Sequence, residues 1–282
     1  MIVYIKTKIL DVISKTVMYL VLIFTVLVSI LPLIWVVMSS FKTNFDILAN
    51  PLALPTSFNL DAYRDVWGLT DFPTLFINSF TIATSAVIVS LLIYSMAAYV
   101  IARYDFRFKN VVYALFVLTL LVPTHARAAP VMMVTRELGI FDTRMALILL
   151  YISIGMAISL FVLRSTFMSI PQEFSEAAWI EGAGFIKTFF LVNLPLAKTG
   201  LATAGTLMFI HNWNEYFFAA LLTGHPDNRT IPYAIRFFQG MFNQDFTAMF
   251  AALTLVILPG ILVYAIFQEQ VARSLVSSGV KG

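Results

Sequence analysis

The chain of 282 residues contains no cysteine. This absence excludes a disulfide framework, a thiolate metal site and a thiol nucleophile. Charge is also scarce, because Asp, Glu, Lys and Arg together form 12% of the chain, against about 25% in a soluble domain. Hydrophobic residues form 60% of it. The composition therefore excludes an ordinary soluble protein and predicts a helical protein that crosses a membrane several times.

Catalytic and nucleotide-binding signatures are missing as well. The sequence has no G-x-x-x-x-G-K-[ST] loop for a nucleotide phosphate, no HExxH and no GxSxG. Its three histidines, His125, His211 and His225, are far apart along the chain, so we expect no metal site. The net charge of +3 is too small to indicate a nucleic-acid partner. We expect a protein that is not itself an enzyme and holds no cofactor of its own.

What the sequence does contain is a set of six long apolar segments. A membrane-spanning helix needs about 20 apolar residues, and six segments reach this length. Proline falls within several of them and predicts kinks, which neighbouring helices can accommodate. The sequence thus predicts an all-α bundle of six transmembrane helices, with residues 1–282 forming one membrane domain. The approximate limits of the six segments are 17–38, 75–102, 111–135, 145–167, 200–222 and 247–267, and the prolines are Pro32, Pro123, Pro130 and Pro259.

The positions of Lys and Arg predict the orientation of this bundle, because cytoplasmic loops carry more of them. An even number of spans puts both termini on one side. We therefore expect both termini, and the loop at about 169–195, to be cytoplasmic. That side would hold eleven of the 18 basic residues, namely Lys6, Lys8, Lys15, Arg103, Arg107, Lys109, Arg164, Lys187, Lys198, Arg273 and Lys281.

The loop at about 169–195 is a polar segment between two apolar ones. Ser169 is a candidate helix cap, and Pro171 fits a first helical turn. Glu173 and Glu176 would favour the positive end of the helix dipole. A glycine at Gly182 would end the helix. We expect a short surface helix with a small-residue face, which another protein could approach closely.

The spacing of residues in this loop resembles the EAA motif of ABC-importer permeases. Val192 stands where the family usually has isoleucine. The resemblance implies that the loop contains a coupling helix, which docks in a cleft on a cytoplasmic ATPase. An ordinary amphipathic loop helix is the alternative. The matching residues are Glu176, Ala177, Ala178, Gly182, Val192, Leu194 and Pro195.

The resemblance also implies a set of partners. These are a second, homologous permease subunit, two cytoplasmic ABC ATPase subunits that bind ATP and Mg, and an extracytoplasmic solute-binding protein. The chain would lie in the lipid bilayer of a prokaryotic inner membrane and carry a solute by alternating access. ATP hydrolysis would belong to the partners.

Two longer loops, at about 41–74 and 223–246, would lie outside. We expect the first to be ordered, with a short helix near residues 60–67. In the second, Pro226–Asn228 favours a turn. The resemblance implies that the following segment reaches a binding protein or its sugar, whereas its composition also fits an aromatic belt at the membrane interface. The candidate contact residues there are Phe237, Phe238, Gln239, Phe242 and Asn243.

Polar residues inside the predicted spans raise a similar choice. Such groups are costly at membrane depth and tend to face a bundle interior or water. Asn212, Asn214 and Glu215 fall within NWNEY, which resembles the corresponding span of carbohydrate permeases. These residues, and His125 after Pro123, could line a path for a hydroxylated solute or form hydrogen bonds to a partner subunit.

The end of the chain, Gly279–Gly282, resembles the tail of maltose-type permeases, although a frayed terminus is the usual state of terminal residues. Together these features resemble the maltose-transporter class of type I ABC-importer permeases. The expected function is a permease subunit for a sugar or oligosaccharide. The alternatives are a permease for a non-sugar solute, a secondary transporter and an intramembrane enzyme.

Overall fold

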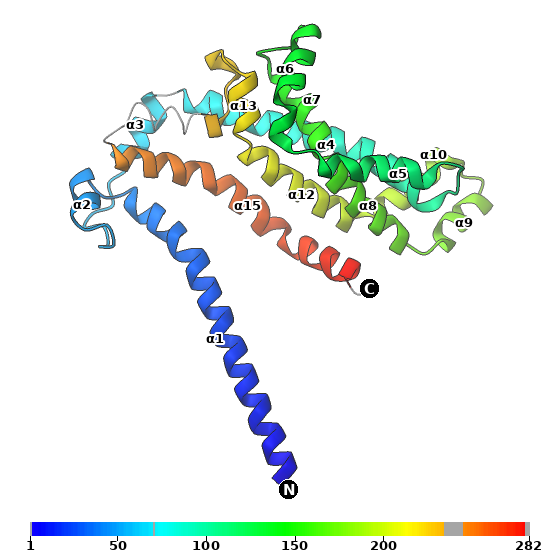
Figure 1. Cartoon of the computed structure of the whole chain (residues 1–282), viewed down its shortest axis with the longest axis horizontal. Coiled ribbons are helices and arrows are strands. Elements are labelled where there is room, and N and C mark those ends of the chain that lie inside the picture. Colours follow the sequence, from blue (N-terminus) through cyan, green and yellow to red (C-terminus); the bar gives the residue numbers. More distant parts are fainter. Residues whose placement is uncertain (1, 70, 234–244, 280–282) are drawn as a thin grey trace. The chain divides into compact units, whose positions relative to one another are not determined.

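A computed structural model describes residues 2–69, 71–233 and 245–279 of the chain. All regular elements in these ranges are helices (Figure 1), which confirms the prediction of an all-α protein. The chain divides into two units. Unit 1 comprises Met1–Thr70 and Phe238–Leu255, and unit 2 comprises Asp71–Phe237 and Val256–Gly282. That the whole chain forms one membrane domain stays a prediction.

Unit 1 is dominated by an exposed apolar helix. Every side chain of residues 11–34 in this helix, α1, is exposed in the isolated chain. Such a surface is stable only in lipid or against another subunit, which agrees with the first predicted span. The helices of unit 1 are α1 (Ile2–Ser39), α2 (Asn44–Ala49), α3 (Asp61–Leu69) and the first part of α15 (Phe246–Gly279).

The loop that follows α1 is ordered, as the sequence predicts. The buried Lys42 ammonium donates to the Pro51 carbonyl at 2.9 Å, and the Trp35 indole donates to the same oxygen at 2.7 Å. Thr43 accepts a hydrogen bond from Asp46 N and so caps α2. Helix α3 confirms the short helix predicted near residues 60–67.

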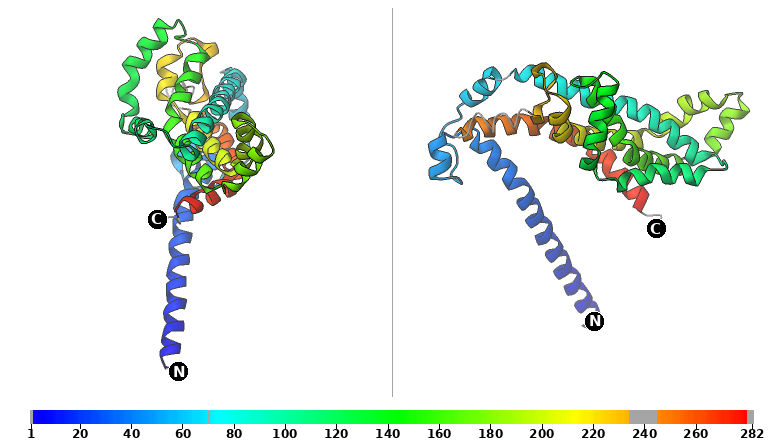
Figure 2. Two further views of the ribbon diagram at one scale, coloured as in Figure 1. Left: turned by 90° about the vertical axis from the view of Figure 1, so that its right-hand side faces the viewer. Right: turned by 45° about the horizontal axis from the view of Figure 1, so that its top comes forward.

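Unit 2 is built around α4 (Phe72–Arg103), which packs against α7, α8 and α12 (Figures 1 and 2). One apolar cluster forms around Tyr99, Leu163 and Phe167, and a second around Tyr151 and Phe218. The other elements of unit 2, apart from the rest of α15, are α5 (Lys109–Leu118), η1 (Thr119–Leu121), η2 (Thr124–Arg127), α6 (Ala128–Glu137), α7 (Arg144–Ile154), α8 (Met156–Ser169), α9 (Glu173–Ile180), α10 (Phe185–Lys187), η3 (Thr188–Asn193), α11 (Leu194–Leu196), α12 (Lys198–Asn214), α13 (Phe217–Leu222) and η4 (Pro226–Asn228).

The predicted spans correspond to helical segments, but only some are single helices. Within the described ranges, three helices are long and apolar enough to cross a membrane, in α1, α4 and α15, and five spans result if two bent pairs are each counted as one. The remaining predicted span, 200–222, is divided between α12 and the six-residue α13. The number of six spans therefore stays a prediction.

The breaks have local causes. The 99° bend between Leu121 and Thr124 contains Pro123, where a kink is predicted. The 47° bend between α7 and α8 lies at Gly155, whose missing side chain leaves room for Met208 of α12. By contrast, α1 and α15 continue through Pro32 and Pro259.

Candidate functional site

The polar loop contains the predicted surface helix, α9, but it begins later than expected. Helix α8 continues to Ser169, whose hydroxyl donates to the Thr166 carbonyl at 2.8 Å within its own helix. The prediction that Ser169 caps the next helix is therefore wrong. Helix α9 begins at Glu173 without a side-chain cap, and Glu173 and Glu176 lie in its first turn as expected.

Helix α9 ends at Ile180, and Gly182 forms the turn that stops it, as the sequence predicts. Gly182 has a φ of +82°, in the left-handed region that favours glycine. Its N–H donates to the Trp179 carbonyl at 3.0 Å, and Ala183 N–H donates to the Ala178 carbonyl at 2.9 Å. These two bonds form a Schellman motif, which satisfies carbonyls that the helix end would otherwise leave unpaired.

The two faces of α9 differ in what they contact. Ser175 and Ala178 are buried against the rest of unit 2, whereas Glu176 and Ala177 are exposed and the side chain of Ile180 is 88% exposed. The predicted small-residue face is thus divided, because Ala178 points inward and only Ala177 points outward. Figure 1 shows α9 and α10 together at one end of unit 2, and Figure 2 shows the same placement from another side.

The second half of the motif lies on irregular helix. Residues Thr188–Asn193 form a π-helix, followed by Leu194–Leu196. Val192 and Leu194 are half-buried, and Pro195 is exposed. The segment contacts α9, so the structure brings both halves of the predicted motif together. Sequence reasoning passed over Asn193, although an amide alone in the apolar run FFLVNLP is a visible signal.

Glu215 is a structural hydrogen-bond acceptor at the break between α12 and α13. Its carboxylate accepts from Phe218 N at 2.8 Å, from Ala219 N at 3.0 Å and from the Tyr151 hydroxyl at 2.9 Å. At membrane depth the free N–H groups of a new helix need such an acceptor. All three bonds lie within unit 2, and a role of Glu215 in the solute path or in a subunit contact stays a prediction.

The other residues of the predicted path are in varied surroundings. Asn212 is buried, and neither polar atom of its amide has a hydrogen-bond partner among the residues that the structure describes. Asn214 is exposed, and its amide donates to the Ile210 carbonyl at 2.8 Å. His125 is exposed, with its ring 4.5 Å from that of Phe217. Both residues lie at breaks in helical segments: His125 follows Pro123 in η2, and Asn214 is the last residue of α12.

The turn of the second long loop, which is predicted to lie outside, is held by Asp142, a residue that the sequence did not single out. Asp142 has a φ of 60°, which Asp tolerates better than most residues. Its carboxylate accepts from Gly224 N at 2.7 Å and His225 N at 3.0 Å. Helix η4 confirms the predicted turn at Pro226–Asn228. The predicted contact residues Phe237, Phe238, Gln239, Phe242 and Asn243 lie outside the described residues.

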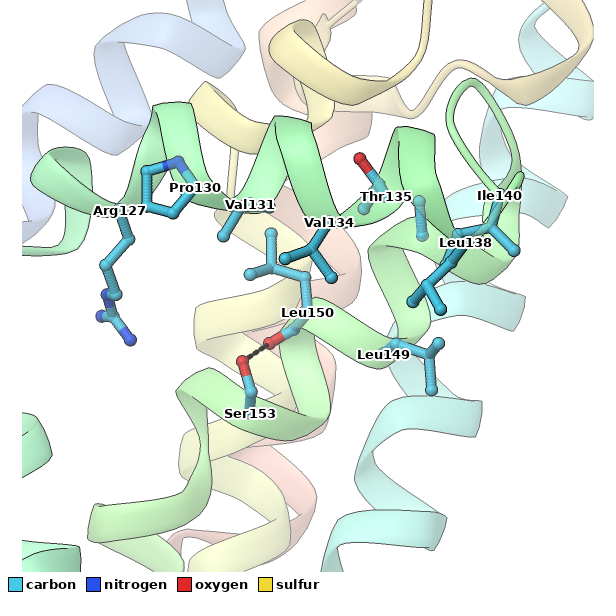
Figure 3. Close-up of a pocket in the computed structure, with 11 residues that line it drawn as sticks. Arg127, Pro130, Val131, Val134, Thr135, Leu138, Ile140, Leu149, Leu150 and Ser153 are labelled. Atoms are coloured by element: carbon cyan, nitrogen blue, oxygen red, sulfur yellow. Dashed lines mark hydrogen bonds between the residues drawn. The ribbon is translucent and has the colours of Figure 1, made fainter.

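A cavity of about 330 Å³ lies between α6 and α7 (Figure 3). Apolar side chains such as Val131, Val134 and Leu150 line most of it, with Arg127 at one end. Ser153, also in its wall, donates to the Leu150 carbonyl at 2.7 Å. The cavity has no cluster of polar groups that would orient a hydroxylated solute.

The fold and the exposed motif helix define a helical membrane protein of the permease class. Residues 90–277 match the family described as binding-protein-dependent transport system inner membrane component. The chain belongs to this family. This confirms the prediction of a permease subunit of an ABC importer, and the alternative of an intramembrane enzyme is rejected.

Individual relatives agree with this assignment. The chain is 33% identical to the diacetylchitobiose uptake system permease protein of Streptomyces coelicolor, over 89% of this chain and 83% of the relative. It is 31% identical to the trehalose/maltose transport system permease protein of Thermococcus litoralis, over 91% of this chain and 93% of the relative. A chain of a bacterial ABC transporter that imports alginate superposes on this chain with a TM-score of 0.78 and a sequence identity of 25%. The superposition covers 92% of this chain and 96% of the transporter chain.

Proposed function

We propose that this chain forms part of the path by which a sugar or oligosaccharide enters the cell, and that it couples this path to ATP hydrolysis in partner subunits. The two relatives are named for saccharide transport, and the structural neighbour belongs to an importer of a polysaccharide. Family membership supports the partners expected from the sequence: a second permease, two ATPases and an external binding protein. Both termini and α9 would be cytoplasmic.

The observation that carries the coupling role is the exposed face of α9. In the described part of the chain, Glu176, Ala177 and Ile180 are exposed, and the Schellman motif at Gly182 fixes how the helix ends. An apolar side chain as exposed as Ile180, flanked by a carboxylate, is typical of a docking surface. The carboxylate of Glu176 would meet a basic or N–H donor group on the ATPase.

The docking role is tested by charge reversal. Glu176→Lys should leave membrane insertion and pairing with the second permease intact, because the residue lies on the exposed face of α9. Truncating a desolvated charge contact costs about 2–5 kcal/mol, so ATPase binding and binding-protein-stimulated hydrolysis should fall at least about tenfold. The control is Glu137→Lys, an equally exposed glutamate at the end of α6 on the predicted outer side. Normal coupling in Glu176→Lys would reject the docking role.

For the solute path, the residues that we retain are Asn214 and His125. Irregular backbone at membrane depth is tolerated where it lines a water-filled cavity or is buried in protein, and both side chains are exposed beside such breaks. The outer turn fixed by Asp142 leads directly into the segment that holds Gln239, which we propose reaches the binding protein. Deleting residues 239–243 should impair uptake and leave the complex assembled, and normal uptake would reject that contact.

The solute class is tested with the complex purified through a tag on this chain and supplied with its binding protein. Maltose, trehalose, diacetylchitobiose and alginate oligosaccharides are compared with glutamine and inorganic phosphate as stimulators of ATP hydrolysis. A saccharide should stimulate hydrolysis. If only glutamine or phosphate stimulates hydrolysis, the transported solute is not a sugar, and the assignment as a permease still holds.

A further inference from the structure

Asn193 is a fully buried amide in an apolar run. Its relative exposure is 0%, and its neighbours in sequence include Phe189, Phe190 and Leu191. A buried amide is costly unless its polar atoms are hydrogen-bonded. The partners of this side chain therefore decide what the residue does.

The amide of Asn193 bonds across three elements. Its Nδ2 lies 3.0 Å from Ser175 Oγ, 3.2 Å from the Thr188 carbonyl and 3.4 Å from the Tyr99 hydroxyl. The Thr188 carbonyl can only accept, which fixes the orientation of the amide with the nitrogen toward it. The amide oxygen then accepts from Ser175 Oγ at 3.4 Å. With two hydrogens for three acceptors, one hydrogen is shared.

The partners are the inner face of α9 and the end of α4. Ser175 is buried on α9, and Tyr99 is buried near the C-terminal end of α4. The Tyr99 ring lies 5.5 Å from that of Phe167 and 5.1 Å from that of Phe189, centroid to centroid. Arg103, one turn further along α4, donates to the Ile170 carbonyl in the linker before α9. Two connections therefore run from α4 toward α9: Tyr99 bonds to Asn193, which also bonds to Ser175 of α9, and Arg103 bonds to the linker before α9.

The π-helix places Asn193 at this junction. Pro195 has no N–H for the Leu191 carbonyl, so a regular α-helix cannot continue through it without loss. The backbone instead widens, and Leu194 N–H donates to Phe189 O, five residues back. Single π-turns of this kind are frequent at functional sites.

We infer that Asn193 is a positioning residue that ties α9 to α4, so that the docking helix and this long helix move as one rigid unit during transport. The inference rests on the proposed docking role of α9. Neither the exposed face of α9 nor the residues of the EAA-like motif include Asn193, so its contribution is separate from theirs.

The test is a distance between spin labels in the assembled complex. This chain has no native cysteine, and labels are placed at Phe174→Cys on α9, which is not one of the proposed docking residues, and at Ile93→Cys on α4. Both positions are exposed. In the parent, which is the doubly labelled chain with Asn193 unchanged, the distance between the two labels should agree within about 2 Å between the nucleotide-free state and the state trapped with ATP and vanadate. In Asn193→Leu it should differ between the two states or broaden, and more ATP should be hydrolysed per solute transported.

Controls separate this role from simple loss of packing. Ser175→Ala should reproduce the effect in part, whereas Ser95→Ala should not, because the buried Ser95 hydroxyl donates to the Leu92 carbonyl of its own helix at 3.0 Å. Asn193→Asp should also uncouple, since a carboxylate cannot donate to the Thr188 carbonyl. Variants are compared at equal amounts of assembled complex.

Two results would overturn the inference: a parent distance that changes by more than about 2 Å between the states, or an Asn193→Leu variant with parental distances and parental ATP consumption. If Glu176→Lys uncouples transport while Asn193→Leu does not, only the positioning role fails. If Glu176→Lys has no effect, the proposed docking role fails, and the label distances still report whether α9 and α4 move together.

Discussion

The conformation of Gly182 allows the coupling role of α9 to be tested through the backbone alone. A Cβ added at this position would meet no atom within 4 Å among the described residues outside its two chain neighbours, so alanine fits there without a clash. The φ of +82° remains unfavourable for any L-residue with a side chain. The left-handed conformation costs about 1–2 kcal/mol for alanine and less for asparagine.

This cost converts into a change of affinity for the ATPase. Gly182 is exposed and follows the end of α9, so in the undocked protein the turn at Gly182 can relax out of the strained conformation, and docking must restore it. At 1.4 kcal/mol for each factor of ten, Gly182→Ala should raise the apparent Kd for the ATPase by about 5- to 30-fold. Gly182→Asn should have a smaller effect, and Gly182→Asp should exceed Gly182→Asn if the added charge is also repelled.

The assay is titration of the purified ATPase subunit onto the permease pair in proteoliposomes. Gly184→Ala is the matched control, because a Cβ added at Gly184 also meets no atom within 4 Å among the described residues outside its two chain neighbours, whereas the φ of −74° there is one that alanine adopts without strain. The reasoning is refuted if Gly182→Ala binds the ATPase like the parent. It is also refuted if Gly184→Ala weakens binding as much, since a left-handed residue would then not be the cause.

Three further predictions concern topology, the broken helix and the outer turn. Introduced one at a time, Ile180→Cys should react with an impermeant thiol reagent only from the cytoplasmic side and His225→Cys only from outside; the reverse pattern would invert the orientation. Glu215→Ala leaves two N–H groups of α13 unpaired, at about 1–3 kcal/mol each, and should lower the melting temperature of the complex more than Glu215→Gln; equal melting would show that the carboxylate is dispensable. Asp142→Ala should speed tryptic cleavage after Arg229 at least about fivefold, and Asp142→Asn less so; unchanged cleavage would show that this side chain does not hold the turn.

Local chemistry in the sequence was sufficient for several features of this protein. Apolar segments of spanning length predicted the helices, because a bilayer requires about 20 apolar residues with all backbone groups bonded internally. The glycine at Gly182 predicted the end of α9, since the left-handed conformation there is accessible to glycine at little cost. The turn at Pro226–Asn228 and the break at Pro123 followed from proline in the same way.

Other features were decided by packing and by hydrogen-bond partners that the sequence pattern does not reveal. Ser169 has the chemistry of a cap, but α8 continues through it, and its hydroxyl bonds within that helix. Ala178 looks like part of a docking face, but packing turns it inward. Asn193 and Ser175 are 18 residues apart in sequence, and only the tertiary structure brings both of them to Tyr99. The physical reason is that burial and hydrogen-bond partners are properties of the folded arrangement, whereas propensity and spacing are properties of the chain.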